Sequence, residues 1–546
     1  MNFKKVVQAL SLISFFTLLL LAARPLIPWL PTDLFLRLDP LVFAGTLLAS
    51  QEWVATLFPA VLILVSTLIL GRFFCGYLCP MGITLDITDR LFTPSRSRLR
   101  DWVQNQARHL RNIKFWILLF ILGTGLVGVS SVFLGAPLSL ITRFYGLALY
   151  PFGVHAWDLK LEALFPAYLS LGWDSLAYAE VQIYRFATQG FVLLFFLVIF
   201  ALVLLTPRFW CRYLCPSGAI LALFSRKPLL RRKVSQACTQ CGQCQRHCPM
   251  EAIPEDPGQT RHQECMVCQE CVRICPEGAI SFGFSSEKTV RQEFWPQRRK
   301  AVASVLAGVG AALFLQTGIR EVRGDVVPGN VSPRFLIRPP GARVEEDFLS
   351  RCIRCGKCMK ACPTNTLQPV WFESGILGLF SPKILPRRGP CEPLCNVCGQ
   401  VCPTGAIREL PVHEKTWARM GTAVVLREKC LAWAWDRKCL VCFEVCPYAA
   451  LELRRVPEIP VPVPFVLLDK CAGCGTCEFH CPVQAQSAIV VEPMHALRMN
   501  HGSYIREGKA QGMELDADPE REREPPEEIM PDREEPDELP PGFSPS

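Results

Sequence analysis

The chain has 546 residues, of which 50% are apolar, and it carries a formal net charge of +9. Its length predicts several domains, and its mean hydropathy of +0.24 is high for a soluble protein, so we expect membrane-spanning segments. Most of the basic excess lies in loops beside the apolar segments, where it would face anionic lipid, and this argues against nucleic acid as a partner.

Five apolar segments are each near the length that spans the hydrocarbon of a bilayer. They are about Val6 to Ala23, Val54 to Gly71, Phe115 to Phe133, Gly190 to Thr206 and Ala301 to Gly318. Lys4 and Lys5 precede the first segment, and basic loops follow the second and fourth, so the positive-inside rule places these loops in the cytoplasm. Arg298 and Arg299 precede the fifth segment. This segment is either a membrane anchor or a twin-arginine export signal. Both interpretations predict that the rest of the chain lies outside the cytoplasm.

The second and fourth apolar segments run into nearly the same motif. The first copy is Arg72-Phe-Phe-Cys75-Gly-Tyr-Leu-Cys79-Pro80, and the second is Arg208-Phe-Trp-Cys211-Arg-Tyr-Leu-Cys215-Pro216. A spacing of i, i+4 places both thiols of a pair on one helical face, and the repeat predicts that all four thiols converge at one membrane depth. Such thiols can act as a dithiol redox relay, hold an additional iron–sulfur centre or bind a soft metal such as Cu(I). Alternatively, they are inert thiols in a buried turn.

The chain has 28 cysteines. The 24 outside these two motifs form six quartets, and each quartet ends in Cys-Pro. Four quartets have the spacing C-x2-C-x2-C-x3-C-P of bacterial ferredoxins, in which three thiolates hold one [4Fe–4S] cluster and the fourth reaches the cluster of a partner motif. They are Cys238, Cys241, Cys244, Cys248; Cys265, Cys268, Cys271, Cys275; Cys352, Cys355, Cys358, Cys362; and Cys471, Cys474, Cys477, Cys481.

Two quartets depart from this spacing. They are Cys391, Cys395, Cys398, Cys402, with a first gap one residue wider, and Cys430, Cys439, Cys442, Cys446, with a Trp-rich insertion after its first cysteine. Structural zinc usually shows separated Cys-x2-Cys halves, and a disulfide framework does not require repeated local triplets. The sequence therefore predicts six [4Fe–4S] clusters with these cysteines as iron ligands.

Partner exchange predicts specific ligand sets. For the first two quartets, one cluster takes Cys238, Cys241, Cys244 and Cys275, and the other takes Cys265, Cys268, Cys271 and Cys248. In the second half, the two irregular quartets lie between two regular ones, and we expect nested pairing of first with fourth and second with third. That pairing places Cys481 with the Cys352 triplet and Cys446 with the Cys391 triplet.

Several other functions are not indicated. None of the eight histidines lies inside a predicted span, so no bis-histidine haem is expected there. Gly308-x-Gly310 lacks the third glycine of a dinucleotide fingerprint, and neither NAD nor flavin is predicted. His247 and His480 are not expected to be ligands. With no catalytic triad or carboxylate pair, the expected chemistry is electron and proton transfer.

The sequence predicts a mixed fold, an α-helical membrane bundle of about five spans with α+β ferredoxin-like cluster domains. The expected order is a four-span membrane domain over 1–236, a cytoplasmic two-cluster domain over 237–290, the fifth span over 291–320, a linker over 321–347, a four-cluster domain over 348–500 and an acidic, proline-rich disordered tail over 501–546.

Residues 1 to 290, with four spans, two Cys-x3-Cys-Pro motifs and two quartets, resemble NapH and MauN, membrane ferredoxins of the quinol-dehydrogenase type. The part from Arg298, with twin arginines, then Arg338-Pro339-Pro340-Gly341-Ala342 and four quartets, resembles the exported ferredoxins NapG and MauM. This resemblance implies a bacterial inner-membrane protein that oxidises quinol and passes electrons to an extracytoplasmic redox partner.

The residues themselves do not identify a quinone site. One candidate region is Leu134 to Ala187, which holds Tyr145, Tyr150, Trp157 and Trp173, although such aromatics commonly anchor a protein at the membrane interface. An alternative function is a maturation or regulatory factor for a metalloenzyme, because relatives with Cys-x3-Cys-Pro motifs can serve metal-centre assembly.

Overall fold

A computed structural model describes residues 3–23, 31–92, 107–170, 182–284, 298–318, 336–372 and 375–515. The chain divides into two compact units. Unit 1 comprises Met1–Leu385, Asn396–Val412 and Arg498–Gly502, and unit 2 comprises Pro386–Cys395, His413–Leu497 and Ser503–Ser546. The structure describes residues 336–347 of the predicted linker and residues 501–515 of the predicted tail. This part of the tail is not disordered as predicted, because it contains the helix α24 (Tyr504–Ala510).

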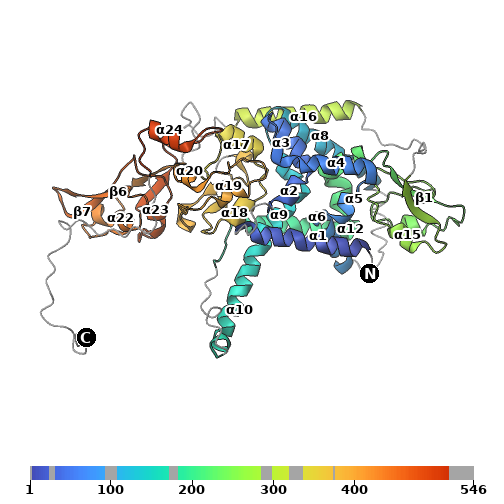
Figure 1. Cartoon of the computed structure of the whole chain (residues 1–546), viewed down its shortest axis with the longest axis horizontal. Coiled ribbons are helices and arrows are strands. Elements are labelled where there is room, and N and C mark those ends of the chain that lie inside the picture. Colours follow the sequence, from blue (N-terminus) through green and yellow to red (C-terminus); the bar gives the residue numbers. More distant parts are fainter. Residues whose placement is uncertain are drawn as a thin grey trace. The chain divides into compact units, whose positions relative to one another are not determined.

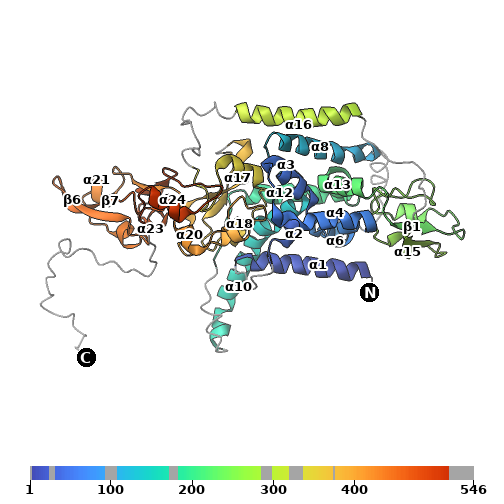
Figure 2. The same cartoon turned by 45° about the horizontal axis from the view of Figure 1, so that its top comes forward.

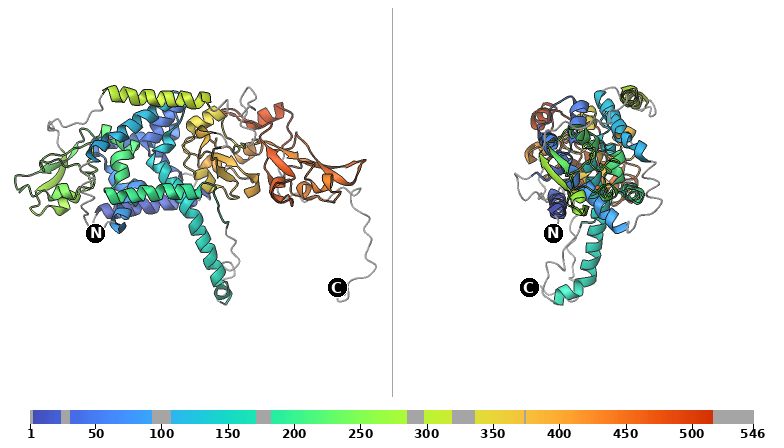
Figure 3. Two further views of the ribbon diagram at one scale, coloured as in Figure 1. Left: turned by 180° about the vertical axis from the view of Figure 1, so that it is seen from behind. Right: turned by 90° about the vertical axis from the view of Figure 1, so that its right-hand side faces the viewer.

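The longer helices belong to unit 1 (Figure 1). They are α1 (Phe3–Leu20), α3 (Pro40–Ser50), α4 (Pro59–Leu70), α6 (Pro80–Phe92), α8 (Ile113–Leu126), α10 (Tyr150–Ser170), α12 (Gln189–Leu205), α13 (Pro216–Phe224) and α16 (Arg298–Gly318). Shorter helical pieces are α2 (Leu34–Arg37), α5 (Phe73–Tyr77), α9 (Pro137–Arg143) and the π-helical η5 (Phe144–Leu149) and η6 (Trp210–Leu214). An apolar core runs through these helices, and α10 projects away from the others (Figure 3).

In the described part of the chain, two helices are long and apolar enough to cross a membrane, Phe3–Leu20 and Arg298–Gln316. The apolar segments expected to form the second and fourth spans give α4 and α12, of 12 and 17 residues. Both helices end within one residue of the expected ends, and α4 begins at Pro59, five residues after Val54. A bundle of five spans therefore stays an expectation from the sequence.

Helix α16 packs along α8 (Figure 2). The contact is close because glycines face it: a Cβ at Gly308 would lie 2.3 Å from the carbonyl oxygen of Phe120, and one at Gly123 would lie 2.5 Å from that of Val305. Gly310, on the same helix, has no atom within 4 Å of its Cβ position. The twin-arginine helix thus packs closely on α8 along one face.

Short helices and two-stranded antiparallel sheets carry the quartets. Unit 1 contains β1 (Leu230–Val234) paired with β2 (Ile280–Phe284), β3 (Leu367–Pro369) paired with β4 (Pro382–Ile384), and helices α14 (Gln243–Arg246), α15 (Glu270–Ile274), α17 (Glu345–Arg351), α18 (Lys357–Ala361) and α19 (Val397–Gln400). Unit 2 contains β5 (Thr422–Val425) paired with β8 (Ile489–Glu492), β6 (Leu451–Val456) paired with β7 (Ile459–Val466), and helices α20 (Val412–Thr416), α21 (Leu431–Ala434), α22 (Val441–Glu444), α23 (Thr476–His480) and α24 (Tyr504–Ala510).

Candidate iron–sulfur centres

The first two quartets form two separate cavities, each lined by four cysteines. One cavity, of about 320 Å³, is lined by Cys238, Cys241, Cys244 and Cys275. The other, of about 370 Å³, is lined by Cys248, Cys265, Cys268 and Cys271. These are the two sets that ligand exchange predicts, and four converging thiols around one cavity fit the [4Fe–4S] clusters of ferredoxins.

The loops that carry the regular triplets share an unusual backbone. In each loop, two residues at equivalent positions on either side of the second cysteine have positive φ. The pairs are Gln240 and Gly242, Val267 and Gln269, Arg354 and Gly356, and Gly473 and Gly475. Val267, with φ 54°, is β-branched, so this conformation is strained and marks a functional constraint. The left-handed residues bend each loop around the site.

The quartets of the second half pair in sequence order, so the nested pairing is wrong. In unit 1, Cys402 lies within electrostatic range of the triplet Cys352, Cys355 and Cys358. In unit 2, Cys446 lines a cavity of about 330 Å³ with Cys471, Cys474 and Cys477, while Cys481 lies near Cys430, Cys439 and Cys442. The Trp-rich insertion is largely exposed, so it changes the spacing without changing the partner. The Cys391 triplet is divided between the units, with Cys391 and Cys395 in unit 2 and Cys398 in unit 1.

Backbone N–H groups donate to the last cysteine of several quartets. Ala252 N lies 3.3 Å from Cys248 Sγ, Ala450 N lies 3.4 Å from Cys446 Sγ and Ala488 N lies 3.4 Å from Cys481 Sγ. Burial raises the pKa of Cys355 and of Cys442 to about 12, so iron must displace a proton from each such thiol. The donor bonds favour the thiolate that iron requires.

The two Cys-x3-Cys-Pro motifs also bring their thiols together. Cys79, Cys211 and Cys215 are buried, and Cys75 lies within electrostatic range of all three. Pro80 and Pro216 begin α6 and α13, so the second cysteine of each motif directly precedes a helix. Gly218 N donates to Cys215 Sγ at 3.2 Å. A helix N-terminus and its free N–H groups stabilise a thiolate at that position.

Two arginines that the sequence reasoning did not single out complete this region. Arg72 and Arg208 each stand three residues before the first cysteine of a motif, and both are almost fully buried. Arg208 Nη1 donates to the Cys75 carbonyl at 2.9 Å and its Nη2 donates to Asp86 at 2.7 Å. A cation repeated at the end of both apolar segments is the signal that could have identified them.

Buried ion pairs attach the first cluster domain to the helices. Glu264, directly before Cys265, accepts from Arg72 Nη1 at 3.0 Å and from Lys114 Nζ at 2.6 and 2.7 Å. Glu251 accepts from Arg212 Nη1 at 3.0 Å and also pairs with Arg111. The Cys248–Cys265 cluster site is therefore fixed against the Cys-x3-Cys-Pro region.

The Cys352 triplet attaches to the same helices by different contacts. Arg143 Nε donates to the Arg354 carbonyl at 3.0 Å, and Arg354 Nη1 donates to the Ser130 carbonyl at 2.8 Å. Ser139 Oγ donates to the Ile353 carbonyl at 2.8 Å. The Arg354 guanidinium lies 4.0 Å from the centre of the Phe133 ring. These contacts hold the backbone between Cys352 and Cys355.

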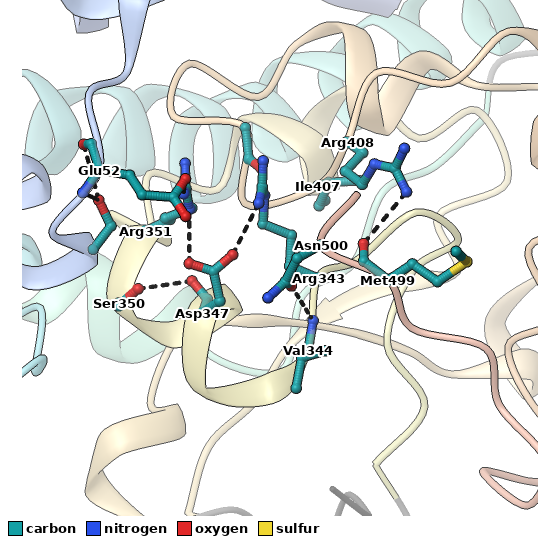
Figure 4. Close-up of polar contacts among 12 residues, drawn as sticks. Glu52, Arg343, Val344, Asp347, Ser350, Arg351, Ile407, Arg408, Met499 and Asn500 are labelled. Carbon is teal, nitrogen blue, oxygen red and sulfur yellow. Dashed lines mark hydrogen bonds and ion pairs between the residues drawn. The ribbon is translucent and has the colours of Figure 1, made fainter. Parts of the chain in front are cut away.

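Helix α17, just before Cys352, is held by a second polar network (Figure 4). Asp347 accepts from Arg351 Nε at 2.8 Å and from Arg343 Nη1 at 2.9 Å, and Arg351 also pairs with Glu52. Val344 N donates to the Asn500 side chain at 3.0 Å. The network ties the Cys352 segment to the helices of unit 1.

The other residues considered from the sequence have ordinary roles. Tyr145 packs against Phe15 and Phe16 and bonds Thr84 at 3.0 Å, whereas Trp157 is exposed on α10. Trp173 lies outside the described residues. His247 and His480 each bond a carbonyl one turn earlier in their own segment.

Three family models match segments of the chain. A 4Fe-4S binding domain matches residues 52–98, 188–235 and 397–415, a second 4Fe-4S binding domain matches 348–368 and 464–487, and a 4Fe-4S dicluster domain matches 231–276.

Curated relatives match the C-terminal part. The methylamine utilization ferredoxin-type protein MauM of Methylorubrum extorquens is 42% identical over 206 residues, which is 36% of this chain and 90% of the relative. The ferredoxin-type protein NapG of Escherichia coli is 37% identical over 220 residues, 38% of this chain and 89% of the relative. MauM of Paracoccus denitrificans is 38% identical over 204 residues, 36% of this chain and 87% of the relative. These likenesses show that the chain belongs to the MauM and NapG family of ferredoxin-type proteins. Together with the cysteine-lined cavities, they show that it is an iron–sulfur electron-transfer protein.

Proposed function

We propose that the chain takes electrons from membrane quinol and delivers them to an extracytoplasmic redox protein. Bound clusters supply one-electron transfer at each ligand set. The observation that carries the proposal is that one compact unit contains the Cys248–Cys265 site, the Cys-x3-Cys-Pro thiols and the Cys352–Cys402 site, all attached to the same helices.

Contacts along helix α1 give the separation between the segment with Cys79 and the segment with Cys358. Ser11 Oγ donates to the Leu78 carbonyl at 2.9 Å, beside Cys79, and Lys360 Nζ donates to the Leu19 carbonyl at 2.7 Å, two residues after Cys358. The eight residue steps from Ser11 to Leu19 correspond to a rise of roughly 12 Å. The segments with Cys79 and Cys358 thus contact one helix at this separation, which supports a redox relay through the Cys-x3-Cys-Pro thiols.

The basic loops support the direction of the route. Under the positive-inside rule the first cluster domain faces the cytoplasm, and α16 returns the chain to the outside before the second half. The layout over 1–236, 237–290, 291–320, 321–347, 348–500 and 501–546 then places a NapH- or MauN-like membrane part and a NapG- or MauM-like part in one chain. A single chain keeps both parts permanently together.

Reduction by quinol tests this function. The full-length chain, purified without oxygen and placed in lipid vesicles, is mixed with a quinol analogue while cluster absorbance is followed. We expect bleaching with the quinol and none with the matched quinone. Clusters that dithionite reduces but the quinol does not would contradict the quinol-linked function and favour a role in maturation or regulation.

Sidedness is tested separately. Protease added to intact spheroplasts should cleave the half that follows α16 and spare the domain with the Cys238 and Cys265 quartets. Protection of both halves would contradict the transmembrane route.

A further inference from the structure

The four Cys-x3-Cys-Pro thiols lie where two copies of one motif cross. Arg72 of the first copy reaches the second: its Nη2 lies 2.9 Å from where a Cβ of Gly218 would be, and Cys215 Sγ lies 3.5 Å from the same point. Arg208 of the second copy reaches the first, with Nη1 3.5 Å from the Cβ position of Gly82. The two motifs therefore share one site with approximate two-fold symmetry.

Two of the three guanidinium nitrogens of Arg72 have no hydrogen-bond acceptor among the described residues of that site. Its Nη1 donates to Glu264 and to the Gln263 carbonyl, each at 3.0 Å. Its Nε and Nη2 are buried and have no hydrogen-bond partner in the described part of the chain. A buried guanidinium that leaves two N–H directions open carries a large desolvation cost unless an anion accepts from it. Besides Glu264, the anion-forming groups that act on Arg72 are the thiols of Cys75 and Cys215.

The thiol spacing favours a cluster over a single ion. Within the described ranges, no three His, Cys, Asp or Glu side chains lie close enough to bind one metal ion. The thiols of the ferredoxin quartets are likewise too far apart to bind one ion. In a [4Fe–4S] cluster, iron and bridging sulfide fill the space between the thiolates. A Cu(I) ion would need its soft ligands at bonding distance.

We propose that Cys75, Cys79, Cys211 and Cys215 ligate a further iron–sulfur cluster, with Arg72 and Arg208 flanking it from opposite motifs. Four thiolates give such a cluster net negative charge, and the free Arg72 N–H groups and the N-termini of α6 and α13 are aimed to offset it. The proposal deepens the electron route proposed above at this same site. Its test requires no quinol, so the two can fail separately.

The test counts iron in the full-length chain. Six [4Fe–4S] clusters account for about 24 iron atoms. After anaerobic reconstitution with iron and sulfide, we expect the wild type to hold about two to four more, and a variant with all four cysteines replaced by serine to lose that excess. The EPR signals of the ferredoxin clusters should be unchanged in the variant. Cys241→Ser, which alters an exposed ligand of a ferredoxin quartet, is the matched control and should change those signals.

Three outcomes would overturn the proposal: a wild-type count of about 24, the same count in the wild type and the variant, or copper or zinc in place of the excess iron. If the serine variant does not accumulate, the wild-type count and its ⁵⁷Fe Mössbauer spectrum still decide. Arg72→Gln provides a second readout. It should keep the additional iron but lower the reduction potential of that centre, because a nearby cation stabilises the reduced cluster. An unchanged reduction potential would show that Arg72 does not act on this centre.

Discussion

The two cluster sites that contact the helices of unit 1 are held in opposite ways. The Cys248–Cys265 site is attached through buried carboxylates, with Glu264 and Glu251 each paired to two cations. The Cys352–Cys402 site is attached through Arg143 and Arg354, which donate to carbonyls and lie over aromatic rings. The first attachment therefore combines two carboxylates with four cations, whereas the second has two cations and no carboxylate.

Arg354 is expected to raise the reduction potential of the second site. Burial lowers the pKa of Arg354 to about 10, and the guanidinium still stays charged at neutral pH. Positive charge beside Cys352 and Cys355 stabilises an added electron. The following predictions test each side of the contrast.

The largest effect is expected from Glu264→Gln. This change leaves Arg72 and Lys114 buried without their shared anion, which costs about 3–5 kcal/mol when a buried pair is broken. Denaturation followed by cluster absorbance should show an early loss of the first cluster domain. Glu277→Gln, at an exposed position three residues before β2 begins at Ile280, serves as the control and should match the wild type. Equal stability of both variants would show that the ion pairs do not hold this domain.

Arg354→Gln tests the other side. The substitution removes the charge near Cys352 and should lower the potential of the Cys352–Cys402 cluster. The Cys238–Cys275 cluster of the same sample is an internal control and should not shift. An EPR redox titration measures both. A fall in both potentials, or in neither, would contradict a local effect of Arg354 on the Cys352–Cys402 cluster.

Gly308→Ala tests the helices that join the two sites. The new methyl group would meet the Phe120 carbonyl, and overpacking of this kind costs roughly 1–3 kcal/mol. Gly310→Ala adds the same methyl to open space on the same helix and should leave the melting temperature equal or slightly higher. If the two variants melt alike, α16 does not pack on α8 as described.

The smallest effect is expected on stability when the pH is lowered. Burial, with Arg231 nearby, lowers the pKa of His262 from 6.5 to about 4, so the folded chain keeps this histidine neutral. The unfolded chain takes up a proton below pH 6.5 and the folded chain does not, so stability is lost as the pH falls from 6.5 toward 4. Melting temperatures at pH 7 and pH 5 should differ less for His262→Gln than for the wild type. An equal difference would mean that His262 titrates normally.

The sequence predicts the local features of these sites better than the remote ones. The Cys-x2-Cys-x2-Cys-x3-Cys-Pro spacing identifies the triplets, since a ferredoxin loop is set by neighbours in sequence. It does not identify the partner quartet, because Cys446 meets the Cys471 triplet through the folded sheets of unit 2. Lys114 and Glu264 are 150 residues apart, and no periodicity connects them.

The convergence of the Cys-x3-Cys-Pro thiols was predictable because the motif itself repeats. The crossing of Arg72 and Arg208 was not, since each guanidinium reaches the other copy of the motif. Hydropathy places the ends of the second and fourth segments within one residue of the ends of α4 at Leu70 and α12 at Leu205. It is less accurate for the third segment, expected to reach Phe133, because α8 ends at Leu126.

The most direct test of the whole account follows one cluster by EPR after a quinol analogue is added to the full-length chain in vesicles. In the wild type, the Cys352–Cys402 cluster should become reduced. In Cys75→Ser it should stay oxidised with quinol and yet be reduced by dithionite, with all six ferredoxin clusters present. Undiminished reduction by quinol in Cys75→Ser would contradict a route through the Cys-x3-Cys-Pro thiols.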